Sequence, residues 1–251
     1  MSFSVNIIGS GNLACHLALA LHQAGNQIIQ IISRNEMAGN ELALQVSASY
    51  QNDISQIKES DFNIFCVSDD AIFSLAKKLP KTNAIVLHSA GAISINVLED
   101  FENFGVFYPL QTFNKNRKLD FSEIPICIEA NNVKTFQKIE SLAKSISNKI
   151  IPMNSEKRKA VHLAAVFANN FTNHLVGIAE DILKENEVST DILFPLLKET
   201  FEKIKSNGAT ESQTGPALRG DEKTIQNHLE LLTKHPKRKE IYELISKAIK
   251  D

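Results

Sequence analysis

The sequence predicts an α/β protein, with an N-terminal doubly wound parallel sheet followed by a smaller all-α C-terminal domain. Short β-branched, apolar runs alternate with segments of helical periodicity as far as Pro152. A glycine-rich turn joins the first strand to the first helix. After Pro152 no convincing strand appears, and helix follows helix. We therefore expect two domains, residues 1–152 and 153–251.

The expected elements follow from the spacing of apolar residues and from turn and cap residues along the chain. Strands are expected at Val5–Ile8, Ile28–Ile32, Ser49–Tyr50, Phe62–Val67, Ala84–Leu87, Gly105–Phe113 (broken by Pro109), Ile124–Glu129 and Ile150–Ile151. Helices are expected at Leu13–Ala24, Glu36–Val46, Ala71–Leu79, Val133–Ser147, Glu156–Glu187, Asp191–Ser206, Glu222–Lys234 and Pro236–Lys250, with Asp53 and Asp221 as caps.

The turn after the first strand has the features of a dinucleotide-binding turn. Gly9 allows a tight turn, Gly11 allows close approach of a pyrophosphate, and the small Ala14 lets helix and strand pack closely. The helix N-terminus also offers free N–H groups to phosphates. The alternative is a sheet-to-helix turn that binds nothing. The residues predicted to bind the diphosphate are Gly9, Ser10, Gly11, Asn12 and Leu13.

The end of the second strand predicts which dinucleotide is bound. NAD-specific sites place Asp or Glu there to accept a hydrogen bond from the ribose 2′-OH, whereas this chain has Ser33, Arg34 and Asn35. An arginine fork and two small polar side chains can hold a 2′-phosphate, which a carboxylate would repel. The sequence therefore predicts NADP rather than NAD as the cofactor. The alternative is that Arg34 is a solvated loop residue.

Two later strand ends are expected at the same edge of the sheet, where ligands of parallel sheets bind. Asp69 and Asp70 are more simply helix caps than cofactor ligands. Gly91 allows the close backbone approach that a nicotinamide ring needs, and His88 is a candidate proton donor or a histidine bonded to a neighbouring carbonyl. The residues expected to contact the cofactor here are Val67, Ser68, Ser89, Ala90 and Gly91.

The helix Arg158–Leu183 is apolar nearly all round, so we expect it to be buried inside its domain or at a subunit interface. Unpaired polar groups in such a place cost roughly 1 to 3 kcal/mol, so its polar residues need partners. They either face substrate and nicotinamide or bond between helices in a dimer core. His162 is the first choice as proton donor, because an imidazole titrates near neutral pH. The other polar residues are Asn169, Asn170, Asn173 and His174.

A loop at Gln213–Asp221 interrupts the C-terminal helices and carries further candidates for substrate binding. Arg219 could clamp a substrate carboxylate through two hydrogen bonds, or it could pair with Asp221 or with a partner subunit. Together with Asn173, the predicted substrate contacts are Thr214 and Arg219.

The composition excludes several classes of function. The formal net charge of -2 provides no basic field for nucleic acid. The three cysteines have no metal-binding spacing, which favours reduced thiols, a cytoplasmic location and no metal site. No apolar run approaches the ~20 residues of a membrane span, and no charged leader precedes the first strand. We expect a soluble, unprocessed protein.

Several motifs together resemble one bacterial family of Rossmann-like NADP oxidoreductases, whose C-terminal helical domain has no assigned function. The motifs are residues 9–14 (GSGNLA), 88–91 (HSAG), 108–113 (YPLQTF), 162–171 (HLAAVFANNF) and 214–219 (TGPALR). More distantly the chain is similar to pyrroline-5-carboxylate reductase and to 6-phosphogluconate and 3-hydroxyisobutyrate dehydrogenases. The resemblance implies an NADP site in the N-terminal domain and a homodimer formed through the helical domain.

The chain departs from these distant relatives at two places. The hydroxyacid dehydrogenases carry a lysine four residues before an asparagine on the long helix, where this chain has Ala165 and Val166 before Asn169 and Asn170. The loop at Thr214 also lacks the Ser-Pro-Gly-Gly-Thr-Thr run of pyrroline-5-carboxylate reductase. Neither substrate can therefore be carried over.

The sequence thus predicts an NADP-dependent oxidoreductase that transfers a hydride between nicotinamide C4 and a small carbonyl or imine held in a cleft between the domains. His162 or His88 would donate the proton, and Asn169 and Asn170 would orient the substrate and the carboxamide. Two alternatives stay open: a sensor or scaffold dimer that binds NADP without turnover, and a reductase that uses a deazaflavin coenzyme beside NADP.

Overall fold

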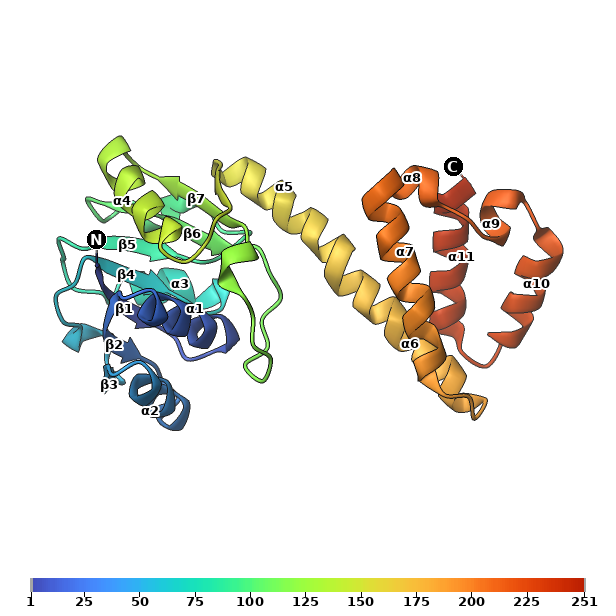
Figure 1. Ribbon diagram of the computed structural model, residues 1–251, viewed down its shortest axis with the longest axis horizontal. Coiled ribbons are helices and arrows are strands. Elements are labelled where there is room, and N and C mark those ends of the chain that lie inside the picture. Colours follow the sequence, from blue (N-terminus) through green and yellow to red (C-terminus); the bar gives the residue numbers. More distant parts are fainter. Residues whose placement is uncertain (1, 251) are drawn as a thin grey trace. The chain divides into compact units, whose positions relative to one another are not determined.

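The computed structural model describes residues 2–250, and its first part is built around one eight-stranded sheet with the order β3-β2-β1-β4-β5-β6-β7-β8 (Figure 1). Neighbouring strands are parallel except β6 and β7, which are antiparallel. The strands are β1 (Ser4–Ile8), β2 (Gln27–Ile32), β3 (Ser49–Gln51), β4 (Phe62–Phe65), β5 (Ile85–His88), β6 (Phe104–Pro109), β7 (Ile126–Ala130) and β8 (Ile150–Pro152). The predicted Rossmann-like fold is confirmed.

Helices cover both faces of this sheet, because its central strands carry apolar side chains on both sides. On one face Ile7 and Ile64 pack in a core with α1 (Asn12–Gln23), α2 (Glu36–Gln45) and α4 (Val133–Lys144). On the other face Ile8 and Phe65 pack in a second core with α3 (Asp69–Ala76) and the short turn η2 (Ile95–Leu98). Successive side chains of a strand point to opposite faces, so a strand that is apolar on both faces contributes to two cores.

Local chemistry sets several element boundaries. Asp53 and Asp221 cap the predicted helices through hydrogen bonds from the backbone N–H of Ser55 (2.9 Å) and Thr224 (3.1 Å). The prediction that Asp69 and Asp70 are caps is wrong, since Ser68 occupies the cap position. Both carboxylates lie in the first turn of α3, where the helix dipole favours negative charge.

The first compact unit ends at Asn170 and the second begins at Phe171, whereas the sequence places the domain boundary at Pro152. The sheet does end there, but α5 (Ser155–Ala165) is fixed to it by Arg158. The Arg158 guanidinium is buried, forms an ion pair with Glu129 of β7, and donates to the carbonyl of Ile93 and to Ser155 Oγ (3.2 Å). This cluster fixes α5 to the sheet, so the first unit continues past the last strand.

The long apolar helix contains a break, because a π-helical turn, η4 (Val166–Phe171), separates α5 from α6 (Thr172–Glu185). Leu163 and Phe167 are 60 % and 62 % exposed. The expectation that this helix is buried inside its domain is therefore wrong for these two side chains, which are largely exposed among residues 2–250. Burial at a subunit interface stays a prediction.

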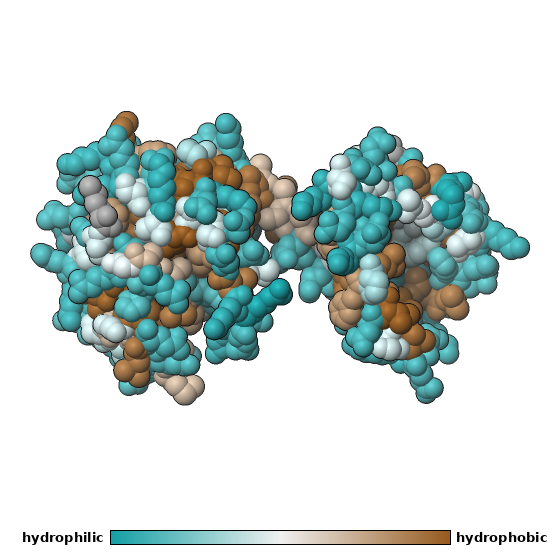
Figure 2. Space-filling model, viewed as in Figure 1, coloured by the Kyte–Doolittle hydropathy of each residue, from teal (hydrophilic) through white to brown (hydrophobic). Residues whose placement is uncertain are grey.

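The second unit is helical and has little core of its own. Its remaining helices are α7 (Leu193–Asn207), α8 (Ala209–Ser212), α9 (Pro216–Arg219), α10 (Glu222–Leu231) and α11 (Pro236–Lys250), with a short turn η5 (Thr190–Ile192). The buried apolar residues described in this unit are Ala217, Ile225 and Leu232. Many large apolar side chains reach its surface (Figure 2): Phe171, Leu175, Ile182, Val188, Ile192, Phe194, Leu196, Phe201, Ile204, Leu218, Leu231, Leu244 and Ile245.

Among residues 2–250, no helix is both long enough and apolar enough to cross a membrane.

The Glu129→Ala variant should lose about 3 to 5 kcal/mol of unfolding free energy, because it leaves the Arg158 charge buried without its partner. Urea denaturation followed by circular dichroism measures this loss. The matched control is Glu123→Ala, which breaks the exposed pair with Lys149 and should cost at most about 1 kcal/mol. Equal losses in the two variants would show that Arg158 does not anchor α5.

Candidate active site

The turn between β1 and α1 tolerates only glycine at its first position. Gly9 has φ of +130°, and a Cβ built there would lie 2.2 Å from the carbonyl oxygen of Cys66. Gly11 precedes α1 and provides no side-chain cap, the first turn of α1 has no acidic residue, and a Cβ at Gly11 would meet nothing within 4 Å. The first N–H groups of α1 therefore have open space in front of them, which suits a phosphate.

Of the three residues after β2, Arg34 is the one whose side chain remains available. Ser33 Oγ lies 2.6 Å from Ser10 Oγ and accepts from the backbone N–H of Asn35 at 3.1 Å. Asn35 Oδ1 caps α2 by accepting from the Ala38 N–H at 3.0 Å. Arg34 is exposed and makes no ion pair or side-chain hydrogen bond to another residue in the range 2–250. Ser33 and Asn35 thus shape the loop that presents Arg34.

A cavity of about 930 Å³ lies along these segments at the carboxyl edge of β1, β2 and β4. It brings together ten of the predicted cofactor residues, namely Gly9, Ser10, Gly11, Asn12, Leu13, Ser33, Arg34, Asn35, Val67 and Ser68. Ser89, Ala90 and Gly91 do not line it. Ser89 Oγ instead donates to the carbonyl of Phe65 at 2.9 Å, which holds the loop after β5 against β4.

The loop after β5 meets α5 and β6 at Gly91. A Cβ at Gly91 would lie 2.6 Å from Nδ1 of His162 and 2.9 Å from Cζ of Tyr108, so the missing side chain makes room for both rings. Tyr108 Oη and His162 Nδ1 are 3.1 Å apart, a hydrogen-bonding distance. Burial is the main cause that raises the pKa of Tyr108 above its usual value. The phenol is therefore protonated near neutral pH, within hydrogen-bonding distance of Nδ1.

This pair lies in a second cavity of about 690 Å³, which the first unit forms from β6, the segment after it, α5 and η4. Asn169 and Asn170 line the same cavity, and Nδ2 of Asn169 lies 3.4 Å from Oδ1 of Asn170. The structure thus brings together three of the four predicted catalytic residues. The residues that complete the lining are Tyr108, Leu110, Gln111, Thr112, Phe113, Val161, Ala164, Ala165, Val166 and Ala168.

His88 lies apart from this cavity, inside the sheet. Its side chain is fully buried and its Nδ1 accepts from the Ala90 N–H at 3.2 Å. Burial first, and then the charge of Arg158, lower its pKa to about 3. His88 is therefore neutral at physiological pH and lines neither of these two cavities, so we do not propose it as the proton donor.

The three predicted substrate residues Asn173, Thr214 and Arg219 belong to the second unit. Asn173 is exposed on α6, and Arg219 is exposed at the end of α9. Thr214 lines a small apolar cavity of about 260 Å³ within the second unit, together with Leu175, Ile178 and residues of α11. None of the three lines the cavity at His162, which consists of residues of the first unit.

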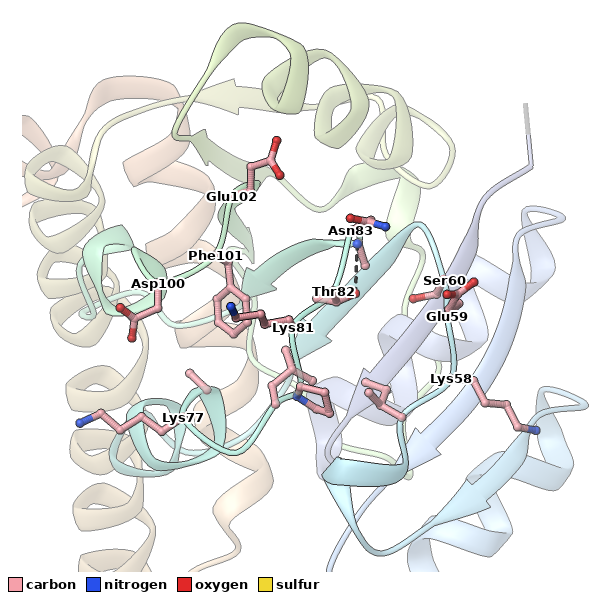
Figure 3. A pocket seen from close by; sticks show the side chains of 15 residues that line it. Lys58, Glu59, Ser60, Lys77, Lys81, Thr82, Asn83, Asp100, Phe101 and Glu102 are labelled. Carbon is pink, nitrogen blue, oxygen red and sulfur yellow. Dashed lines mark hydrogen bonds between the residues drawn. The ribbon is translucent and has the colours of Figure 1, made fainter.

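A third hollow of about 880 Å³ lies at the amino edge of the sheet, opposite the glycine turn (Figure 3). Both acidic and basic side chains line it, so it has no single sign of charge. This is the pattern of a solvated surface rather than of a site for one charged ligand. The charged residues are Lys58, Glu59, Lys77, Lys81, Asp100 and Glu102. Within residues 2–250 no three His, Cys, Asp or Glu side chains form a group that could hold a metal.

Sequence reasoning missed Tyr108 and Arg158. Tyr108 stood in a recognised motif beside Pro109, and a tyrosine at the carboxyl end of a central strand was a signal for a site residue. Arg158 gave no such signal, because an arginine at the start of a helix is usually solvated.

The fold and the glycine turn define a Rossmann-type dinucleotide-binding protein, and comparisons with known proteins agree. Residues 4–91 match the family described as NADP oxidoreductase coenzyme F420-dependent. Residues 124–249 match a domain of unknown function, DUF2520. A solved structure from Bacteroides fragilis, named a "putative NADP oxidoreductase", is 38 % identical, covers 99 % of this chain and 98 % of its own, and has a TM-score of 0.93. The chain belongs to this family of NADP oxidoreductases with a C-terminal DUF2520 domain.

Two more distant structures share the fold. 1-Pyrroline-5-carboxylate reductase from Streptococcus pyogenes is 15 % identical, with a TM-score of 0.66 over 99 % of this chain and 98 % of that one. A reductive aminase from Aspergillus terreus, in complex with NADPH and ethyl-5-oxohexanoate, is 14 % identical, with a TM-score of 0.70 over 99 % and 93 %. No curated protein matches the sequence. The predicted resemblance is confirmed, and with it a general oxidoreductase role.

Two glycine variants should separate the folding role of the turn from its binding role. Gly9→Ala should lower the melting temperature, because its Cβ collides with the Cys66 carbonyl. Gly11→Ala should fold normally but bind NADP at least about tenfold more weakly, because its methyl group fills the space for a phosphate. Thermal denaturation and titration calorimetry measure the two effects. Normal NADP affinity in Gly11→Ala would place the phosphates elsewhere.

Proposed function

We propose that this protein is an NADP-dependent oxidoreductase that transfers a hydride between nicotinamide C4 and a small carbonyl or imine substrate. The observation that carries the proposal is that one cavity joins an uncapped helix N-terminus to an arginine without a partner. A second cavity of the first unit adds a tyrosine–histidine pair. Such an arrangement can position a cofactor and supply a proton, which is what a hydride-transfer enzyme must provide.

The residues of the first cavity fit NADP. The N–H groups at the start of α1 would bind the diphosphate, and the open space at Gly11 lets it approach. Arg34 would bind the 2′-phosphate, and no carboxylate follows β2 to prefer a free ribose hydroxyl. Bound NADPH would supply the hydride, and every proton would come from the protein or from water.

His162 is the proposed proton donor. If the Tyr108 hydroxyl donates to Nδ1, the ring N–H lies on Nε2, and this N–H would be available to the substrate oxygen or nitrogen. Tyr108 and the close-packed Gly91 fix the ring in one orientation. Asn169 and Asn170 are proposed to orient the substrate and the carboxamide. The substrate roles of Asn173, Thr214 and Arg219 stay predictions.

The protein is also proposed to act as a homodimer formed through the second unit. Helices α6, α7 and α11 contain no buried residue, although each has an apolar face. Amphipathic helices are stable when that face is covered. A second copy of the chain would present the same apolar faces, so a symmetric dimer would cover both. A cytoplasmic location stays a prediction from the reduced cysteines.

Turnover tests the proposed function against the sensor alternative. The purified protein should bind NADP more tightly than NAD and oxidise NADPH when offered a suitable ketone or imine from a panel, with loss of absorbance near ~340 nm. His162→Asn should lower kcat by roughly 100-fold or more while leaving the Kd of NADPH unchanged. Tyr108→Phe should lower kcat less, because the imidazole keeps its proton but loses its fixed orientation. Binding of NADPH without turnover of any substrate would favour the sensor.

Analytical ultracentrifugation tests the dimer. The wild-type protein should sediment with the mass of two chains, and Leu196→Asp should shift it toward one chain, because a carboxylate replaces an exposed apolar side chain of α7. The control is Leu44→Asp on α2 of the first unit, where the leucine is 82 % exposed. A monomeric wild-type protein, or dissociation of the control as well, would contradict the proposal.

A further inference from the structure

The wall of the cofactor cavity includes one face of α3 and the residues that follow it. Ala71, Ser74, Leu75 and Lys78 line the cavity, at the three- and four-residue steps that put side chains on the same side of a helix. The backbone N–H of Lys78 bonds to the carbonyl of Leu75 at 3.0 Å, so Lys78 continues the helical path beyond the end of α3. Its position at the cavity is therefore set by the fold.

The charges of this cavity are few. Among the described residues that line it, Arg34 and Lys78 are the cations and Asp53 is the anion. Asp53 is already committed, because its carboxylate accepts from the N–H (2.9 Å) and the hydroxyl (2.7 Å) of Ser55. No hydrogen bond or ion pair within residues 2–250 uses the Lys78 ammonium. The cofactor cavity is thus lined by two cationic side chains, Arg34 and Lys78, that form no ion pair within residues 2–250.

The positive charge of Lys78 acts on Asp53, which lines the same cavity. Hydrogen bonds from Ser55 are the main cause that lowers the pKa of Asp53, and the Lys78 charge adds a smaller lowering. Asp53 would by itself repel a phosphate, so a site for a doubly charged group here needs more than one cation to offset it.

We propose that Lys78 is a specificity-determining residue that binds the 2′-phosphate of NADP together with Arg34. The inference rests on the proposed function, since it assigns the second cation of the same nucleotide site. Arg34 supplies a planar fork and Lys78 a flexible point charge, which together match the charge of a phosphate monoester. NAD lacks this phosphate, so Lys78 contributes little to its binding.

The preceding residue provides a matched control. Lys77 is also exposed and carries the same charge, but its Nζ lies 4.2 Å from the ring centroid of Phe73. Lys77 lines the hollow at the amino edge of the sheet and not the cofactor cavity (Figure 3). A general loss of positive charge would affect both variants equally, whereas a direct contact would affect one.

Titration calorimetry with NADP and with NAD tests the proposal in the wild type, Lys78→Gln, Lys77→Gln, Arg34→Gln and the Arg34→Gln/Lys78→Gln double variant. Lys78→Gln should weaken NADP binding about tenfold, or about 1.4 kcal/mol. It should leave NAD binding within about twofold, and Lys77→Gln should change neither. The double variant should bind both nucleotides alike. Circular dichroism melting confirms that each variant is folded.

The outcomes distinguish a wrong assignment of Lys78 from a wrong proposed function. If Lys78→Gln keeps the wild-type preference for NADP while Arg34→Gln loses it, the NADP site stands and the assignment of Lys78 falls. If Lys78→Gln weakens NADP and NAD equally, Lys78 binds the part that the two nucleotides share, and it does not determine specificity. If the wild-type protein binds neither nucleotide, the proposed function itself is wrong.

Discussion

The cofactor site depends on the close approach of Gly9 to the Cys66 carbonyl. This contact sets β1 and β4 side by side at their carboxyl ends and directs the chain into α1. With any larger residue the turn would move, and the N–H groups of α1 would no longer face the cavity between β2 and α3. The two residues that bring positive charge to that cavity are Arg34, in the loop after β2, and Lys78, in the turn that continues α3.

The second site depends on a different constraint, a buried charge. Arg158 joins α5 to β7 and to the chain after β5, and His162 lies one helical turn further along. Because Arg158 fixes the start of α5, His162 reaches Tyr108 of β6 and the open face of Gly91. The buried ion pair thus positions the proposed proton donor, although it touches neither cavity.

The sequence predicts the sheet, the glycine turn and the caps Asp53 and Asp221 well, because each depends on local pattern, whereas Ser68 and not Asp69 or Asp70 is the cap of α3. It predicts that His162, Asn169 and Asn170 act together, since they share a helix. It fails for Arg158 and Tyr108, whose roles come from contacts with distant segments such as Glu129 and α5. The spacing also does not reveal that Asn35 accepts a hydrogen bond from the Ala38 N–H. This bond uses the Asn35 side chain as a helix cap and leaves Arg34 to bind a ligand.

The π-helical turn η4 gives the two asparagines an unusual setting. A π turn holds one more residue than an α turn and is rarer because it is less stable, yet such turns recur at functional sites. The loss of one residue between Val166 and Phe171 would therefore turn this segment into a regular α-helix that continues α5 into α6. Such a change would rotate Asn169 and Asn170 around the helix axis while leaving His162 in place, so relatives of this protein could evolve a new substrate preference without rebuilding the proton donor.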